Sequence, residues 1–292
     1  MAECVTSYRA TLGEGPLWVA SRNALYWIDI REDTLLRYEP ATGRTGLMKL
    51  PARPTALVEH AAGHLVVSFK KGLGAVDFDL QRAWTLPIEG VDFAREDFND
   101  AACDASGRLW IGTRDPDPAP RARVGKLYRV GPGLRARCMD EGFVISNGRA
   151  WSPDGATFYH TDSMPGRIDA YDFDAASGSL SNRRVFIDYT GRGFRPDGCT
   201  VDAEGCLWVA EVEGSRVARY SPRGELLQRV ELPVRKPSSV MFGGDDLRTL
   251  FITTVSAGLT SEEASAQPLA GGLFAHRSDV PGLPEHPFRS SP

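Results

Sequence analysis

The fold of this chain follows from one stretch, Arg195-Pro196-Asp197-Gly198-Cys199-Thr200-Val201-Asp202-Ala203-Glu204-Gly205-Cys206-Leu207-Trp208-Val209-Ala210. A polar residue before glycine, Asp197, leads into a short apolar run, a glycine-bearing turn and an apolar strand with a leucine-tryptophan pair. The same order of residue types recurs from Phe98 to Thr113, and again, with Asn147 as the polar residue, from Ser146 to His160. A pattern that returns at regular spacing predicts a repeated structural unit.

Short strands rich in aromatic and β-branched residues recur along the whole chain, each bounded by turn residues. They are Leu25–Ile28, Leu65–Phe69, Leu109–Ile111, Thr157–Tyr159, Leu207–Val209 and Leu250–Ile252. Each is followed by a further strand and, in most cases, a second turn. Six units of roughly 40 to 50 residues with about four strands each are typical of propeller blades. The sequence therefore predicts an all-β, six-bladed β-propeller of four-stranded antiparallel blades.

A ring of blades needs a closure, and we expect residues 1–292 to form one propeller domain closed by an N-terminal strand. Val5 to Arg9 is predicted to pair as the outer strand of the last blade, near Leu273 to Ala275. Two stretches depart from the repeat: Asp115 to Pro120, which is proline-rich, and Gly258 to Pro268. The nearest candidate for a helix, Ser261 to Gln267, is short and is expected to be a loop turn.

The composition excludes several classes of partner. The chain has 34 basic and 38 acidic residues and a formal net charge of −4, with no clustered basic run, so nucleic acid is not an expected partner. The N-terminal sequence does not resemble a signal peptide, and no apolar stretch is long enough to span a bilayer. Five cysteines lack the close pairs of a zinc site. We expect a cytoplasmic protein with no membrane association, either a monomer or a weak homo-oligomer.

Four oxygen-bearing side chains occupy equivalent places in four of the units, 10 or 11 residues ahead of the aromatic strand: Glu14, Asn99, Asn147 and Asp197. In a propeller this place enters the innermost strand, so the four side chains should converge on the central channel at one face. Carboxylate and amide oxygens are the ligands of a hard cation. The five histidines are scattered and none has metal-site spacing. Ca and Mg fit this chemistry, while Zn, Mn and Fe(II), which tolerate carboxylates, stay open.

These residues stand within motifs that resemble the regucalcin (senescence marker protein 30) and gluconolactonase family over essentially the whole chain. The motifs are Leu12-Gly13-Glu14-Gly15-Pro16, Asn99-Asp100, Ile145-Ser146-Asn147-Gly148, Pro196-Asp197-Gly198 and Gln267-Pro268-Leu269-Ala270-Gly271-Gly272. The resemblance implies a six-bladed propeller with one divalent cation in its channel and, in many bacterial members, hydrolysis of sugar lactones. It implies Glu14, Asn147 and Asp197 as metal ligands, Asn99 as a substrate contact and Asp197 as the catalytic base.

One departure from the family pattern concerns the rim that faces the substrate. Familiar members have arginine two residues before the asparagine of the Asn-Asp pair, where this chain has Asp97, and an acidic residue where this chain has Arg121. The exchanged charges allow a reversed ion pair between Asp97 and Arg121 at the substrate rim, although two unrelated exposed loop charges would explain them equally well. Gluconolactone or xylonolactone specificity therefore does not follow from the resemblance.

The leading hypothesis is metal-dependent hydrolysis of a sugar-acid lactone in carbohydrate catabolism, with Asn99, Asp97 and Arg121 orienting the substrate. A covalent serine mechanism is disfavoured because the chain has no Gly-x-Ser-x-Gly turn. An organophosphate or aryl-ester hydrolase is the first alternative, since the same cation would polarise P=O as readily as C=O. The second alternative is a cation-binding propeller without catalytic activity, because fold alone does not fix function.

Overall fold

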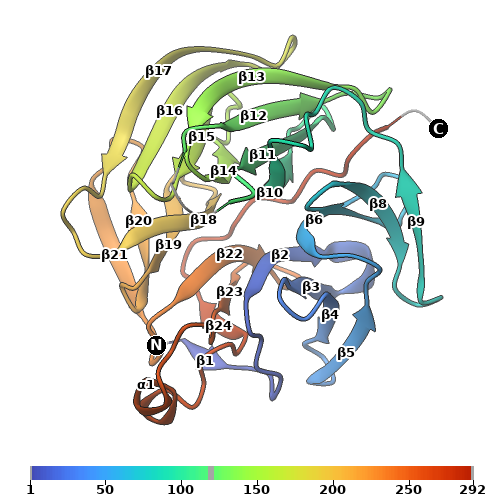
Figure 1. The fold of residues 1–292 in the computed structure, drawn as a ribbon. Helices are drawn as coiled ribbons and strands as arrows, with labels where there is room; N and C mark the ends of the chain where they lie inside the picture. The colour runs from blue at the N-terminus through green and yellow to red at the C-terminus, as the bar shows by residue number, and fades with distance from the viewer. Residues whose placement is uncertain (1, 118–121, 291–292) are drawn as a thin grey trace.

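The computed structural model describes residues 2–117 and 122–290, which form six four-stranded antiparallel sheets arranged as the blades of a ring (Figure 1). The predicted six-bladed propeller is therefore confirmed. In every blade the strands follow one another in chain order from the channel outwards, except that the last blade takes its outer strand from the N-terminus.

The strands of the first three blades are, in order, β2 (Gly13–Val19), β3 (Ala24–Asp29), β4 (Thr34–Glu39), β5 (Arg44–Lys49); β6 (Pro54–Glu59), β7 (Leu65–Phe69), β8 (Gly72–Asp77), β9 (Arg82–Leu86); β10 (Asp97–Cys103), β11 (Leu109–Arg114), β12 (Gly125–Val130) and β13 (Ala136–Phe143). Those of the other three are β14 (Ser146–Trp151), β15 (Thr157–Asp162), β16 (Arg167–Asp174), β17 (Ser179–Asp188); β18 (Arg195–Val201), β19 (Leu207–Val212), β20 (Arg216–Tyr220), β21 (Leu226–Glu231); β22 (Pro237–Gly243), β23 (Thr249–Thr254), β24 (Phe274–Arg277) and β1 (Glu3–Cys4).

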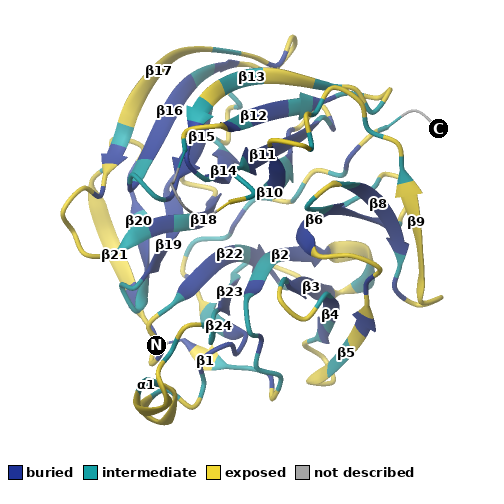
Figure 2. Cartoon of the chain, in the orientation of Figure 1, coloured by how far each residue is buried: buried dark blue, intermediate teal, exposed yellow. Residues whose placement is uncertain are grey.

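Burial is greatest in the second strand of each blade and falls toward the rim. The second strands are almost continuously apolar and buried, as in β19, whereas fourth strands such as β21 are mostly exposed (Figure 2). The first strands β2, β6, β10, β14, β18 and β22 contact one another in sequence around the ring. Apolar side chains fill the space between neighbouring blades, since each sheet is covered on both faces.

The repeated turn before the leucine-tryptophan strand is locked by one aspartate. In blade 5, Asp202 Oδ1 accepts hydrogen bonds from the backbone N–H groups of Glu204 and Cys206, both at 3.0 Å, and its Oδ2 accepts one from Trp208 Nε1 at 2.8 Å. Asp104 makes the equivalent contacts in blade 3, including one from Trp110 Nε1 at 2.7 Å. A buried carboxylate is thus satisfied by backbone and indole donors, and it fixes the turn to the core of the blade.

The ring closes with the N-terminal strand, as predicted, but the pairing lies slightly earlier in the sequence than Val5 to Arg9. Glu3 pairs with Ala275 and Cys4 with Phe274, and the Val5 N–H donates to the Leu273 carbonyl oxygen at 2.8 Å. Only the beginning of the predicted segment takes part, because the chain then turns inwards toward β2.

The expectation of a loop turn at Ser261 to Gln267 was wrong, since α1 (Ser261–Ala266) is a short helix. Its capping box supplies the reason: Thr260 Oγ1 accepts from the Glu263 N–H, and Glu263 Oε2 accepts from the Thr260 N–H. Within the described residues, no helix is long and apolar enough to cross a membrane.

The C-terminal segment, residues 279–290, crosses the ring after the last blade and is drawn in the reddest colours of Figure 1. Backbone hydrogen bonds attach both ends of this segment to blades of the ring. The Gly282 N–H donates to the Leu247 carbonyl, whereas the Phe288 N–H donates to the Glu59 carbonyl on the other side of the channel, both at 2.7 Å. Phe288 is fully buried in the core beside Val58 and Phe98. The segment therefore ties the sixth blade to the second and third.

Replacing Phe288 with alanine should lower the free energy of unfolding by about 3 to 5 kcal/mol, because a fully buried ring that anchors the segment is lost. Urea denaturation followed by tryptophan fluorescence measures this. Leu227, which is 51% exposed, provides the control: Leu227→Ala should cost less than about 1 kcal/mol. An equal decrease in the free energy of unfolding in the two variants would contradict an anchoring role for Phe288.

Candidate functional site

Each innermost strand contains a β-bulge, and the predicted site residues lie at these bulges. The register between first and second strands shifts between Glu14 and Leu17, Phe98 and Ala101, Asn147 and Arg149, and Pro196 and Cys199, and likewise in β6 and β22. A bulge leaves residues outside the ladder and re-aims their side chains. The chain thereby turns polar side chains toward the channel at the same level of several blades.

Glycines beside these residues allow the inner strands to approach closely. A Cβ atom on Gly148 would lie 2.2 Å from the Asp197 carbonyl oxygen, and one on Gly198 would lie 2.0 Å from Ser239 Oγ. Since real Cβ atoms do not approach so closely, these positions require glycine. The close packing brings the polar residues of blades 4, 5 and 6 together.

Two of the predicted metal ligands are in direct contact. Asn147 Nδ2 donates to Asp197 Oδ1 and, at 3.1 Å, to Ser163 Oγ. Asn99 Nδ2 donates to the carbonyl oxygen of Ser146, the residue before Asn147, at 3.2 Å. Blades 3, 4 and 5 are therefore linked at the level of the bulges, with the side chains of Asn99, Asn147 and Asp197 as the connecting groups.

Glu14 and Asp197 are half-buried carboxylates, and neither forms an ion pair with any described residue. Burial raises the pKa of Glu14 well above its usual range, and repulsion from Asp197 and then from Asp100 raises it further. Burial also raises the pKa of Asp197 to about 8; Arg195 opposes this shift and Asp100 adds to it. Glu14 and Asp197 therefore both experience the negative charge of Asp100.

The donor set matches a hard cation. Two carboxylates without an ion-pair partner can supply oxygen ligands, and a divalent ion would offset the burial and the like-charge repulsion that raise both pKa values. The Asn147 amide lies beside them: its Nδ2 faces Asp197, and its Oδ1 accepts the Gly148 N–H at 3.1 Å. In residues 2–117 and 122–290, no three His, Cys, Asp or Glu side chains cluster as a metal site. The predicted ligand set contains only two such residues and depends on Asn147 for its third donor.

Asp97 has two partners that were not predicted from the sequence. Its carboxylate is buried and lies 2.8 Å from Lys70 Nζ and 2.7 Å from Lys71 Nζ, both from the turn between β7 and β8 of the neighbouring blade. The predicted partner Arg121 lies outside the described residues. The two lysines leave the Asp97 carboxylate already occupied, so its predicted role in orienting a substrate has no support from its contacts and stays a prediction.

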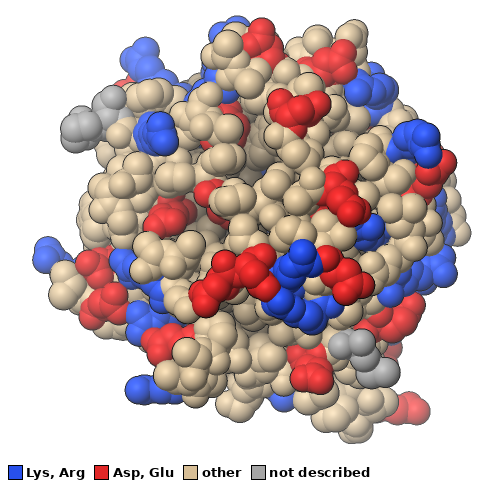
Figure 3. All heavy atoms as spheres, turned by 180° about the vertical axis from the view of Figure 1, so that it is seen from behind, with Lys and Arg blue, Asp and Glu red and all other residues tan. Residues whose placement is uncertain are grey.

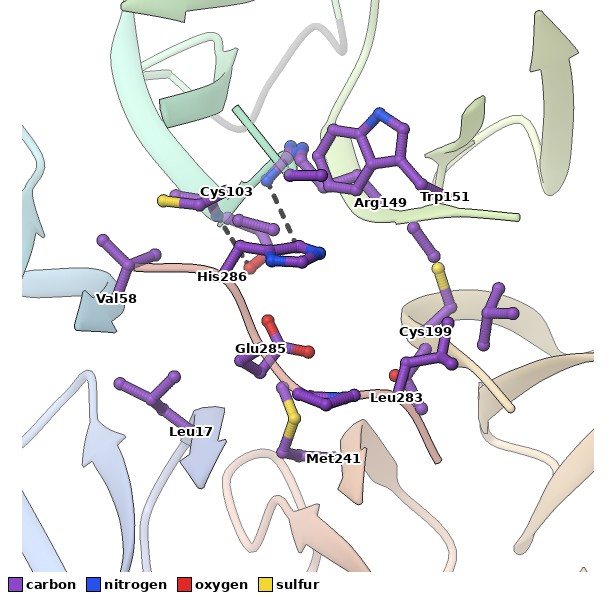
Figure 4. A pocket seen from close by; sticks show the side chains of 18 of the residues that line it. Leu17, Val58, Cys103, Arg149, Trp151, Cys199, Met241, Leu283, Glu285 and His286 are labelled. Carbon is purple, nitrogen blue, oxygen red and sulfur yellow. Dashed lines mark hydrogen bonds and ion pairs between the residues drawn. The ribbon is translucent and has the colours of Figure 1, made fainter. Parts of the chain in front are cut away.

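A cavity of about 170 Å³ lies in the channel beyond the bulges and is lined by all six innermost strands and the C-terminal segment. Its walls are largely apolar, but Asp100, Arg149 and Glu285 also line it. Figure 4 shows Glu285 extending from the C-terminal segment into the cavity, with Arg149 on the wall across from it. Burial raises the pKa of Glu285 to about 7, and repulsion from Asp100 contributes.

These three charged residues were not among the predicted site residues. Asp100 was visible as the second residue of the Asn-Asp pair, which is an ordinary turn pair. Arg149 follows the Asn147-Gly148 motif, and Glu285 lies beyond the last repeat, where the repeat pattern gives no signal.

The outer surface has mixed charge. On the face shown in Figure 3, basic and acidic side chains of the described residues are interspersed rather than gathered in an extended patch of one sign. This distribution gives no electrostatic support for binding a polyanion there.

Comparisons with known proteins agree with the fold and show the family. The family model "SMP-30/Gluconolactonase/LRE-like region" matches residues 12–256. The chain is 36% identical over 288 residues to a 6-deoxy-6-sulfogluconolactonase of Pseudomonas putida, covering 98% of each chain. It is 35% identical over 291 residues to regucalcin of Gallus gallus, covering 98% of this chain and 97% of that one. The crystal structure of a calcium-binding protein, regucalcin, from Agrobacterium tumefaciens superposes with a TM-score of 0.92 at 28% identity, covering 99% of this chain and 97% of that one.

The raised pKa of Asp197 predicts how the stability of the metal-free protein depends on pH. An acid whose pKa is higher in the folded chain binds more protons when folded, so its stabilising contribution is complete below the unfolded pKa, about 4, and is lost as the pH rises toward about 8. With chelator present, the Tm should fall by several degrees, on the order of 4 °C, between pH 5 and pH 8.

Asp197→Asn should show a smaller fall, because the amide does not titrate, while Glu14 and Glu285 keep part of the effect. Differential scanning calorimetry at several pH values measures both slopes. The exposed Asp188 gives the matched control, since Asp188→Asn should keep the wild-type slope. A slope that is unchanged in Asp197→Asn would show that Asp197 is not the titrating group.

Proposed function

Since the chain belongs to the SMP-30/gluconolactonase/LRE-like family, we propose that it hydrolyses a sugar-acid lactone to the free acid with a divalent cation in its channel. What supports the proposal is the contact of Asn147 with Asp197 between two innermost strands, with Glu14 at the equivalent bulge of a third strand and neither carboxylate in an ion pair with a described residue. Buried charges of one sign are costly, and a bound cation compensates them.

Glu14, Asn147 and Asp197 would hold the cation, which when bound supplies a Lewis acid for the lactone carbonyl. The Asp197 carboxylate, in its ionised form, accepts a proton from water as the water oxygen bonds to the carbonyl carbon. The bond to the ring oxygen then breaks, and Asp197 returns the proton to that oxygen, which becomes the hydroxyl of the sugar acid. A pKa close to the working pH suits a group that first takes and then gives a proton.

Asn99 is suited to contact the substrate beside this group. Its Nδ2 donates to the Ser146 carbonyl, and its Oδ1 makes no hydrogen bond within the described part of the chain, so this oxygen can accept one from a sugar hydroxyl. A polyhydroxylated ring needs such fixed acceptors and donors for orientation. The sulfogluconolactonase relative supports an aldonolactone as the substrate class, including lactones that carry an anionic substituent.

Asp197→Asn and Glu14→Gln should each reduce kcat/KM on a responsive lactone by at least about 100-fold, since one removes the proton acceptor and the other a cation ligand. A pH-indicator assay on a panel of neutral and anionic aldonolactones with five- and six-membered rings measures this at saturating Ca²⁺ or Mn²⁺. Asp188→Asn, a change of the same type at an exposed carboxylate, should retain wild-type activity.

The assay also includes a phosphotriester and an aryl ester. Full metal-dependent lactonase activity in both site variants would overturn the assignment. Faster turnover of the phosphotriester or aryl ester than of every lactone would identify a different hydrolase, and tight cation binding without turnover would identify a binding protein.

A further inference from the structure

The predicted site residues lie near the starts of the innermost strands, and the channel cavity lies toward the ends of these strands. The wall of the cavity contains none of Glu14, Asn99, Asn147 and Asp197. It contains residues that follow them in the same strands, and it continues to the turns after β10 and β14. The cavity therefore occupies a part of the channel that the proposed reaction does not use.

The wall offers mainly apolar surface to a ligand. Figure 4 shows Leu17 and Val58 on one side of the cavity and Cys199 and Leu283 on the other. An apolar cavity of about 150 Å³ holds benzene, so the volume of about 170 Å³ suits a six-membered ring with one small substituent. Burial of apolar surface would provide most of the affinity for such a ligand.

One carboxylate faces this apolar space without a partner. Glu285 projects from the C-terminal segment into the cavity (Figure 4), and it forms no hydrogen bond or ion pair within residues 2–117 and 122–290. The neighbouring His286 does not supply a counter-charge, because partial burial lowers the pKa of its imidazole and leaves it neutral at pH 7. The main cause of the raised pKa of Glu285 is burial, so its charge is poorly solvated in the cavity.

The other charged side chains of the wall have partners of opposite charge. Asp100 Oδ2 lies 3.3 Å from Arg149 Nη1. Arg108 Nε donates to Asp104 Oδ2 at 2.7 Å. Among the described residues, the charge that the wall leaves uncompensated is therefore that of Glu285, and it is negative.

We propose that this cavity binds a small organic ammonium ion, with Glu285 as its counter-charge and the apolar wall around its hydrocarbon part. The N–H groups of an ammonium ion donate to a carboxylate, and its hydrocarbon part needs an apolar surface. A hydrated metal ion would leave that surface uncovered, and an anion would be repelled by Glu285. This binding site goes beyond the proposed lactone hydrolysis and does not depend on it.

Isothermal titration calorimetry of the full chain with benzylammonium chloride tests the proposal. Benzylammonium should bind with a Kd on the order of 1 mM or lower. Benzyl alcohol has the same ring without a charge and should bind at least about tenfold more weakly, because a hydrogen bond between two charged groups is lost. Benzoate, which reverses the charge, should bind more weakly than either.

Glu285→Gln keeps the size of the side chain and removes its charge. It should weaken benzylammonium binding at least about tenfold and change benzyl alcohol binding by less than about threefold. Glu231→Gln is the matched control, since Glu231 is an exposed glutamate at the end of β21, and it should leave both affinities unchanged. Leu283→Trp fills part of the cavity and should weaken both ligands at least about tenfold.

Asp197→Asn separates this cavity from the proposed cation site. Because Asp197 is not part of the cavity wall, this variant should bind benzylammonium within about threefold of the wild type. If Asp197→Asn loses binding and Glu285→Gln retains it, the ammonium ion binds at the cation site and the proposal is overturned. Equal affinities of the wild type for benzylammonium and benzyl alcohol, or binding of neither, would also overturn it. None of these results bears on lactone hydrolysis, which the pH-indicator assay measures independently.

Discussion

The bulge in each innermost strand is the constraint on which the site depends. A regular strand would direct alternate side chains into the two neighbouring interfaces between blades, where carboxylates have no solvation. The bulge interrupts this alternation beside Glu14, Asn147 and Asp197, and the strand returns to its regular register a few residues later. Because the interruption recurs in every blade, polar side chains far apart in sequence come into contact, as Asn147 does with Asp197.

The acidic side chains near the inner strands lower the stability of the fold. Close approach of the inner strands concentrates negative charge, and the raised pKa values of Glu14, Asp197 and Glu285 show that the folded chain holds these groups against their tendency to ionise. The rest of each blade compensates with apolar interfaces and with locked turns such as the one at Asp202. Local departures from the rules of a stable core are expected where a protein binds a ligand.

The sequence predicted the blades because their pattern is local. The turn aspartates, the leucine-tryptophan strands and the spacing of Asn99 and Asp197 all lie within one repeat. Contacts that cross between blades had no such signal. Asp97 meets lysines of the preceding blade, Asp100 meets Arg149 of the following one, and Glu285 arrives from a segment outside the repeat. The helix at α1 was predictable from Thr260 and Glu263, whose spacing is that of a capping box, whereas the closing strand lay a few residues from its predicted position.

Both ends of the chain are built into the ring. The N-terminal strand completes the blade formed by the last strands of the sequence, and Phe288 is inserted into the core next to the second and third blades. In an open array of repeats a terminal unit can separate while its neighbours stay folded. In this closed ring no blade is terminal. One blade can therefore separate only if its contacts with both neighbouring blades are lost. Unfolding should then proceed as a single cooperative event, with no partially opened ring accumulating along the way.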